Sequence, residues 1–186
     1  MTYDELTESV RLIESGTLVL RTSLSRRCRH LAMGVDVAGD YAVTVFARRS
    51  VGRTVTDSWV LTRRDGPWSL LFGGTGDVVK NILEHRPARL DAGLPPELGF
   101  SPHVAISYTG VVRDSGARGI VRPTGRWVYF SSVQVSADVA AVAIGSRRVA
   151  VPWHGEVPLV WTGRRPRIEV QAEDGTVLGQ DRLCAP

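Results

Sequence analysis

The spacing of apolar residues changes at Gly16. Before it, apolar side chains recur at steps of three or four, the period of one face of an α-helix: Tyr3, Leu6, Val10 and Ile13. Thr2 and Glu5 have the spacing of a capping box, and Gly16 stands where a glycine commonly ends a helix. The pattern predicts a helix over residues 3–15 whose apolar stripe lies on a sheet.

After Gly16, apolar residues alternate with polar or small ones, which is the period of a β-strand. Four segments show this alternation most clearly: Leu31–Val37, Tyr41–Val45, Val55–Leu61 and Trp68–Phe72. Asp65-Gly66 is a hairpin signal between the last two. We therefore expect a meander of four or five antiparallel strands. The glycine-rich stretch GGTGD at 73–77 is interpreted as the turn that ends it, with Asp77 as the N-cap of a short helix over Val78–His85.

Beyond Pro102 the chain has the pattern of short strands separated by turn residues. The expected strands are His103–Val112, Gly119–Arg122, Trp127–Val135, Val139–Ile144, Arg147–Trp153, Val157–Trp161, Arg167–Ala172 and Thr176–Leu183. This spacing is typical of a β-sandwich, and Trp127, Trp153 and Trp161 are expected in its core. Because the Cys–Trp–Cys arrangement of antibody domains is missing, "Ig-like" describes the architecture only.

The fold predicted from these patterns is mostly β, and α+β at the N-terminus. A helix with an antiparallel meander is expected over residues 1–88, a linker or ordered loop over 89–102, and an Ig-like β-sandwich over 103–186. The 186 residues are 43% hydrophobic and 23% charged, which excludes a disordered tail, a collagen-like repeat and a coiled coil. A chain of this length can bury a core without metals or disulfides.

The first residues, MTYDELTESV, lack the basic start and apolar stretch of a secretory signal, and no run approaches 18 apolar residues. We therefore expect a bacterial cytoplasmic protein without a membrane span.

The net charge of +4 comes almost entirely from arginine, since Lys80 is the only lysine. A GC-rich genome explains this excess more simply than a binding partner does. One dense basic patch stands out in RTSLSRRCRH at 21–30, formed by Arg21, Arg26, Arg27 and Arg29. Because the patch has no interleaved aromatic residues for base stacking, it gives nucleic-acid binding only weak support.

Local catalytic and cofactor patterns are absent from the sequence. There is no GxSxG or HExxH motif, and GGTGD lacks the residues that complete a dinucleotide or Walker phosphate loop. Cys28 and Cys184 are too few for a disulfide scaffold, and the histidines have no metal-type spacing. We therefore predict no cofactor and no metal site, and we favour a protein that is not an enzyme.

One candidate site is a small-ligand pocket in the N-terminal half, formed by Asp36, Asp57, Trp59 and Trp68. The two carboxylates fall on expected strands, and if they share a sheet face they can share a proton or hold a cation. The aromatic residues can line a cavity. The alternative is that the tryptophans fill the core and the aspartates lie on a solvated face.

A second candidate is an interface near an expected strand junction, formed by Trp153, His154, Glu156 and Trp161. Loops at the ends of strands often carry binding residues, and His154 with Glu156 also has the composition of an acid/base pair. The alternative is structural, with Trp153 capping the core and His154 serving as a turn residue.

Two segments resemble known sequences: DGPWSLLFGGTGD at 65–77 and VPWHGEVPLVWTGRRPRIEVQAEDGTVLG at 151–179. They resemble a group of uncharacterised actinobacterial proteins, in which a tryptophan hairpin precedes a glycine-rich turn and a sandwich-like half ends the chain. The resemblance implies a source and a fold, and it brings no activity with it.

The function expected from these observations is a non-catalytic protein-binding or assembly module, since exposed strand edges and end loops of sandwiches recognise proteins. The first alternative is a small-ligand-binding protein or enzyme with the pocket described above. The second is nucleic-acid binding through the arginine patch. The sequence leaves the oligomeric state open.

Overall fold

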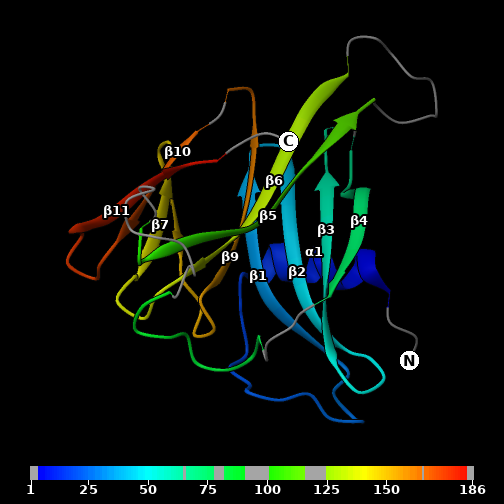
Figure 1. Cartoon of the computed structure of the whole chain (residues 1–186). Helices are drawn as coiled ribbons and strands as arrows, with labels where there is room; N and C mark the ends of the chain where they lie inside the picture. The colour runs from blue at the N-terminus through cyan, green and yellow to red at the C-terminus, as the bar shows by residue number, and fades with distance from the viewer. Residues whose placement is uncertain are drawn as a thin grey trace.

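A computed structural model describes residues 4–64, 66–77, 82–90, 101–115, 125–164 and 166–183. Within these ranges the chain forms one helix followed by eleven strands, and the strands make three antiparallel sheets (Figure 1). The expected mostly-β fold with an N-terminal helix is confirmed.

The helix α1 (Glu5–Ser15) lies across one face of the first sheet (Figure 1). Asp4 is its N-cap, and the side chain of Asp4 accepts a hydrogen bond from the N–H of Leu6. Gly16 ends the helix in the left-handed conformation, with φ of 59°, as its position in the sequence predicts. The predicted cap at Thr2 lies outside the described residues.

The first sheet is a meander in the order β1-β2-β3-β4. Its strands are β1 (His30–Ala38), β2 (Tyr41–Arg49), β3 (Thr54–Thr62) and β4 (Ser69–Asp77). The GGTGD stretch does not end the meander as expected, because it forms the second half of β4. Gly73 pairs directly with Trp59 of β3, whose ring carbon Cζ3 lies 1.9 Å from the point where a Cβ of residue 73 would stand. The glycine therefore makes room for an aromatic ring on the neighbouring strand.

Residues 82–84 form a turn where the second half of the predicted helix over 78–85 was expected. The first half of that segment, residues 78–81, lies outside the described residues. The two ends of the expected linker over 89–102 lie close together. The N–H of Leu90 donates a 2.9 Å hydrogen bond to the carbonyl oxygen of Pro102.

The C-terminal strands form two further sheets, in the orders β5-β6-β9 and β11-β10-β7-β8. Their bounds are β5 (Val104–Asp114), β6 (Arg126–Val135), β7 (Ala141–Ile144), β8 (Arg147–Ala150), β9 (Glu156–Thr162), β10 (Arg167–Gln171) and β11 (Val177–Arg182). Each overlaps a strand expected from the sequence, and the remaining expected strand, 119–122, lies outside the described residues.

The sheet β5-β6-β9 is the middle layer, because both of its faces are apolar and packed. One face meets the first sheet in a cluster of Tyr41, Val43, Val60, Val128, Phe130 and Val160. The other face meets β7 and β10 in a larger cluster that includes Val133, Val135, Val142, Val157, Leu159, Trp161, Ile168 and Val170. The first of these cores therefore joins residues of the 1–88 range with residues of the 103–186 range.

A bulge in β5, between Ile106 and Tyr108, lets a single strand serve both cores. Val104 and Ile106 pack on the larger cluster, whereas Tyr108 and Val112 pack on the cluster against the first sheet. All four residues are even-numbered, so an unbroken strand would point them to the same face. The extra residue of the bulge reverses the alternation and turns the second half of β5 toward the first sheet.

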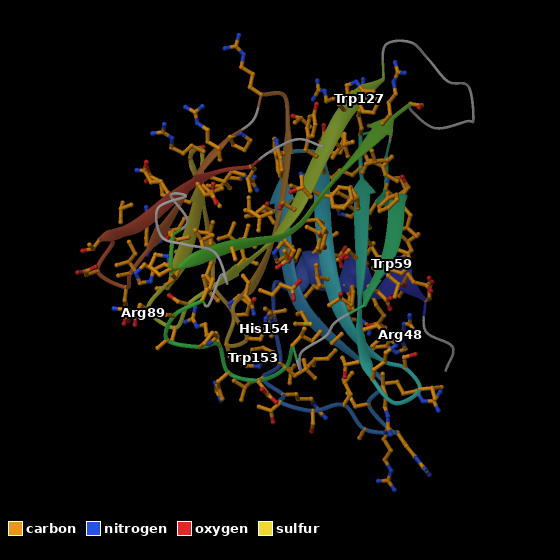
Figure 2. All side chains as sticks on the ribbon, in the orientation of Figure 1. Arg48, Trp59, Arg89, Trp127, Trp153 and His154 are labelled. Carbon is orange, nitrogen blue, oxygen red and sulfur yellow. The ribbon has the colours of Figure 1, made fainter. Side chains whose placement is uncertain are left out.

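The three tryptophans expected in the C-terminal core differ in exposure. Trp161 is buried and Trp153 is half-buried, whereas Trp127 is 49% exposed. Trp127 is the second residue of β6, and Figure 2 shows it at the upper tip of the strand. The guanidinium of Arg113, directly opposite on β5, lies 5.4 Å from the centre of the Trp127 ring. The expectation that Trp127 lies in the core is wrong, because the end of β6 projects into solvent.

In the described part of the chain, no helix has both the length and the apolar character needed to cross a membrane.

Candidate functional site

His154 is a buried structural residue, with 3% of its surface exposed. Its Nδ1 lies 3.0 Å from the backbone nitrogen of Glu156, and its Nε2 lies 2.9 Å from the carbonyl oxygen of Met33 in β1. A backbone N–H can only donate, so Nδ1 is the acceptor and Nε2 carries the proton that it donates to Met33. Burial, the largest cause, lowers the pKa of His154 to about 4. The neutral ring thus ties the β8–β9 turn to β1.

Glu156 does not form the acid/base pair with His154 that its sequence position allowed. Its carboxylate accepts a hydrogen bond of 2.7 Å from the hydroxyl of Ser132 on β6, and burial raises its pKa above the ordinary value. Both ring nitrogens of His154 are occupied by backbone groups, so neither can take a proton from a substrate in this arrangement.

The predicted interface over residues 153–161 therefore lies largely inside the molecule. Trp161 is buried in a stack with Tyr129, with ring centres 5.7 Å apart. Trp153 meets the ring of His154 edge-on and packs against the cluster of Leu31 and Met33 (Figure 2). The side chains of His154 and Trp161 are buried, so they do not form an exposed interface. They are buried because β9 belongs to the middle sheet and β1 lies against β9.

The pocket expected from Asp36, Asp57, Trp59 and Trp68 is not assembled. Asp36 pairs in register with Val43, and Asp57 pairs with Phe46. Positions 43 and 46 of β2 point to opposite faces of the sheet, so the two carboxylates do as well. The expectation that they share a face is wrong.

On the face of the first sheet opposite the middle layer, Asp57 is held by two neighbours. Its Oδ2 lies 2.5 Å from Nε of Arg48, and its Oδ1 accepts a 2.7 Å hydrogen bond from the hydroxyl of Thr75. Trp59 covers Gly73 on the same face, whereas Trp68 lies in the β3–β4 connection under the guanidinium of Arg63. Trp59 thus packs on β4 and Trp68 packs on a surface arginine, so the two rings do not line a common pocket.

Asp36 takes part in a contact that joins all three sheets. Nη1 of Arg147, on β8, donates to Oδ1 of Asp36 on β1, and Nη2 of Arg147 donates to the carbonyl oxygen of Val160 on β9, at 2.7 Å. Oδ2 of Asp36 accepts the N–H of Val160 at 2.8 Å. Burial raises the pKa of Asp36, although Arg147 and this N–H act in the opposite direction. We refer to Asp36 and Arg147 as the inter-sheet clamp.

The outer edge of β4 is a feature that the sequence analysis missed. β4 is the last strand of its sheet, and among the described strands only β3 pairs with it (Figure 1). From Ser69 to Gly76 it has no charged residue, and its apolar side chains Leu70 and Phe72 are 41% and 42% exposed. A lack of charge over eight residues of an edge strand was the available signal, but an edge cannot be recognised from the sequence alone.

The other described edge strands differ from β4 in charge or in cover, although β4 also has a bulge, at Leu71 between Leu70 and Phe72. The edge strands β1 and β9 lie against each other, and β5 ends in Arg113 and Asp114. β8 carries two arginines, and β11 ends in Asp181 and Arg182. Bulges, charges and covering elements are the usual means by which natural sheets prevent edge pairing.

The four arginines of the predicted basic patch, Arg21, Arg26, Arg27 and Arg29, are all exposed, in the irregular segment 16–29. The carbonyl oxygen of Arg29 accepts the N–H of Arg49, at 2.8 Å, which places this segment beside the β2–β3 hairpin.

Across the described ranges, no group of three or more His, Cys, Asp or Glu residues comes together in a way that could hold a metal ion.

The chain matches no protein-family model, no curated protein and no solved structure, so the resemblance of residues 65–77 and 151–179 to actinobacterial proteins stays a prediction.

Proposed function

We propose that this protein is a non-catalytic binding module that recruits another protein by pairing an extended segment of it with the outer edge of β4. The observation that carries the proposal is the edge itself, which is uncharged from Ser69 to Gly76 and, among the described strands, pairs only with β3. In strand addition, main-chain hydrogen bonds provide affinity and the side chains beside the edge provide specificity.

The composition of β4 suits the approach of a second backbone. Gly73, Gly74 and Gly76 keep side-chain bulk away from the C-terminal half of the strand, and glycine in a strand often marks a close approach of this kind. Phe72 lies 5.4 Å from the ring of Phe130 in the middle sheet, which fixes one side of the Phe72 ring and leaves the other exposed. A partner strand with an apolar residue opposite Phe72 would bury that surface.

The test is a selection of random twelve-residue peptides displayed on phage, followed by hydrogen exchange with the selected peptides. We expect peptides with alternating apolar residues that protect amides within residues 69–77. Gly74→Lys should abolish binding by placing a charge on the edge, whereas Gly74→Ala, which makes only an ordinary 3.4 Å contact with Phe72, should retain it. Protection centred on another strand, or equal binding to both variants, would contradict the proposal.

A further inference from the structure

Two arginine-bearing turns lie side by side at the lower end of the first sheet, where the segment 16–29 passes the β2–β3 hairpin (Figure 1). One is closed by a 3.0 Å hydrogen bond from the N–H of Ser25 to the carbonyl oxygen of Cys28. The other is closed by a 2.8 Å bond from the N–H of Ser50 to the carbonyl oxygen of Arg53. The Arg49–Arg29 backbone bond joins them. We call their exposed arginines the basic ridge: Arg26, Arg27, Arg29, Arg49 and Arg53.

Four of the five arginines of the basic ridge have no acidic neighbour among the described residues. Among the residues that the structure describes, no carboxylate lies within ion-pair distance of Arg26, Arg27, Arg29 or Arg49. Asp57 is buried and already bonded to Arg48 and Thr75.

The adjoining histidine, His30, is affected mainly by burial and by neighbouring charges of both signs. Burial is the main cause that lowers the pKa of His30, the charges of Arg48 and Arg29 lower it further, and Asp57 and Glu5 oppose them. The exposed arginines, not the histidine, make the lower end of the sheet a surface to which an anion is attracted.

We propose that the basic ridge binds the phosphate backbone of a nucleic-acid duplex without sequence preference. The planar guanidinium group donates two parallel hydrogen bonds to phosphate oxygens, so an arginine surface fits this ligand better than a lysine surface does. Residues 21–30 and 48–54 contain no Phe, Tyr or Trp on which an unpaired base can stack, which favours a duplex over a single strand.

An anionic membrane is the competing source of phosphate groups. Val51, at the tip of the β2–β3 hairpin, is 97% exposed and would be the residue to enter the lipid. The other exposed apolar residues of this region, Val19 and Leu20, lie outside both turns. Within the turns a single valine buries too little apolar surface to hold a protein at a bilayer, so the arginines favour the nucleic acid.

This inference is independent of the proposed function, because it uses none of the residues of β4. The test is fluorescence anisotropy of the full chain with a mixed-sequence 20-base-pair DNA duplex, at 50 to 300 mM KCl. Four phosphate contacts should give a slope of log K against log salt of about −4. Arg26→Gln with Arg27→Gln should reduce the slope by about 2 and weaken binding roughly tenfold or more at 100 mM salt.

The matched control is Arg148→Gln with Arg164→Gln, which removes the same charge from exposed positions on β8 and in the β9–β10 connection, outside the basic ridge. We expect it to bind within about twofold of wild type, with melting temperatures showing that both variants fold. Gly74→Lys should leave duplex binding unchanged, since it tests β4 alone. Absence of binding at 50 mM salt, equal weakening by both arginine pairs, or binding to phosphatidylserine vesicles without binding to the duplex would overturn the proposal.

Discussion

At the scale of single residues, the stability of the fold depends on the protonation states of the polar side chains that are buried between the sheets. His154 has to stay neutral, because a second ring proton would place a donor on Nδ1 opposite the N–H of Glu156. Glu156 has only one side-chain partner described, the hydroxyl of Ser132, so its buried charge is poorly compensated.

His154 should make the protein less stable in mild acid. Its folded-state pKa of about 4 lies below the ordinary 6.5, so between these values the unfolded chain binds a proton that the folded chain does not. The stability contributed by the neutral ring is complete above pH 6.5 and is lost as the pH falls toward 4, by up to about 3 kcal/mol. We expect urea unfolding to show the advantage of wild type over His154→Gln at pH 8 shrinking across this range. A constant difference between the two proteins would contradict this role.

Glu156 should have the opposite pH dependence. Its pKa is raised by burial, so its contribution to stability is complete below its ordinary pKa and is lost as the pH rises through the raised value. Glu156→Gln keeps an acceptor for Ser132 and removes the buried charge. We expect its melting temperature to exceed that of wild type at pH 8 by a few degrees, about 2–4 °C per kcal/mol for a chain of this size. At pH 4 the two should be nearly equal, and a variant that is less stable at both pH values would show that the carboxylate is needed.

At the scale of strands, glycines paired directly with aromatic residues recur in two sheets. Gly73 faces Trp59 across β4 and β3, and Gly110 faces Phe130 across β5 and β6. In both pairs an aromatic ring carbon lies within about 2 Å of where a Cβ would be built. The ring of one strand thus covers the bare backbone of its neighbour, a known means of stabilising glycine in a sheet.

Neighbouring glycines of β4 should respond differently to the same substitution. Gly73→Ala forces Trp59 out of its position and should cost about 1–3 kcal/mol, the usual penalty of overpacking. Gly74→Ala has an ordinary contact of 3.4 Å and should change the unfolding free energy by less than about 1 kcal/mol. Chemical denaturation of the two variants checks this difference, and equal costs would mean that Trp59 is free to move.

The strands were predicted well from the sequence because alternation of apolar and polar residues is a local property. The predictions that proved wrong concern residues whose role is set by a distant part of the chain. GGTGD has the composition of a turn, but Gly73 is required by Trp59, which precedes it on another strand. His154 stands in a turn and would be exposed there if Met33 and the rest of β1 did not cover it. Which sheet a strand faces depends on features such as the β5 bulge, and the periodicity does not reveal them.

At the scale of the whole molecule, the inter-sheet clamp is the one described ion pair that links the first and third sheets and also bonds to the middle one. Arg147→Ala would leave the carboxylate of Asp36 buried without its cationic partner and should cost about 3–5 kcal/mol. The control is Arg148→Ala, at the exposed next position of β8, which should stay within about 0.5 kcal/mol of wild type. Calorimetry measures both, and a small loss at Arg147 would show that water or another group replaces it.

The packed middle layer also has a consequence for synthesis on the ribosome. The first sheet is complete once β4 has emerged, but the residues that cover its apolar face come from β5, β6 and β9, and Val160 follows about 80 residues later. At about 5–20 residues per second, synthesis of this interval takes roughly 4–16 s. During that time Tyr41, Val43 and Val60 are open to solvent on a meander whose outer strand is uncharged. The nascent chain is therefore exposed to aggregation until β9 has been made.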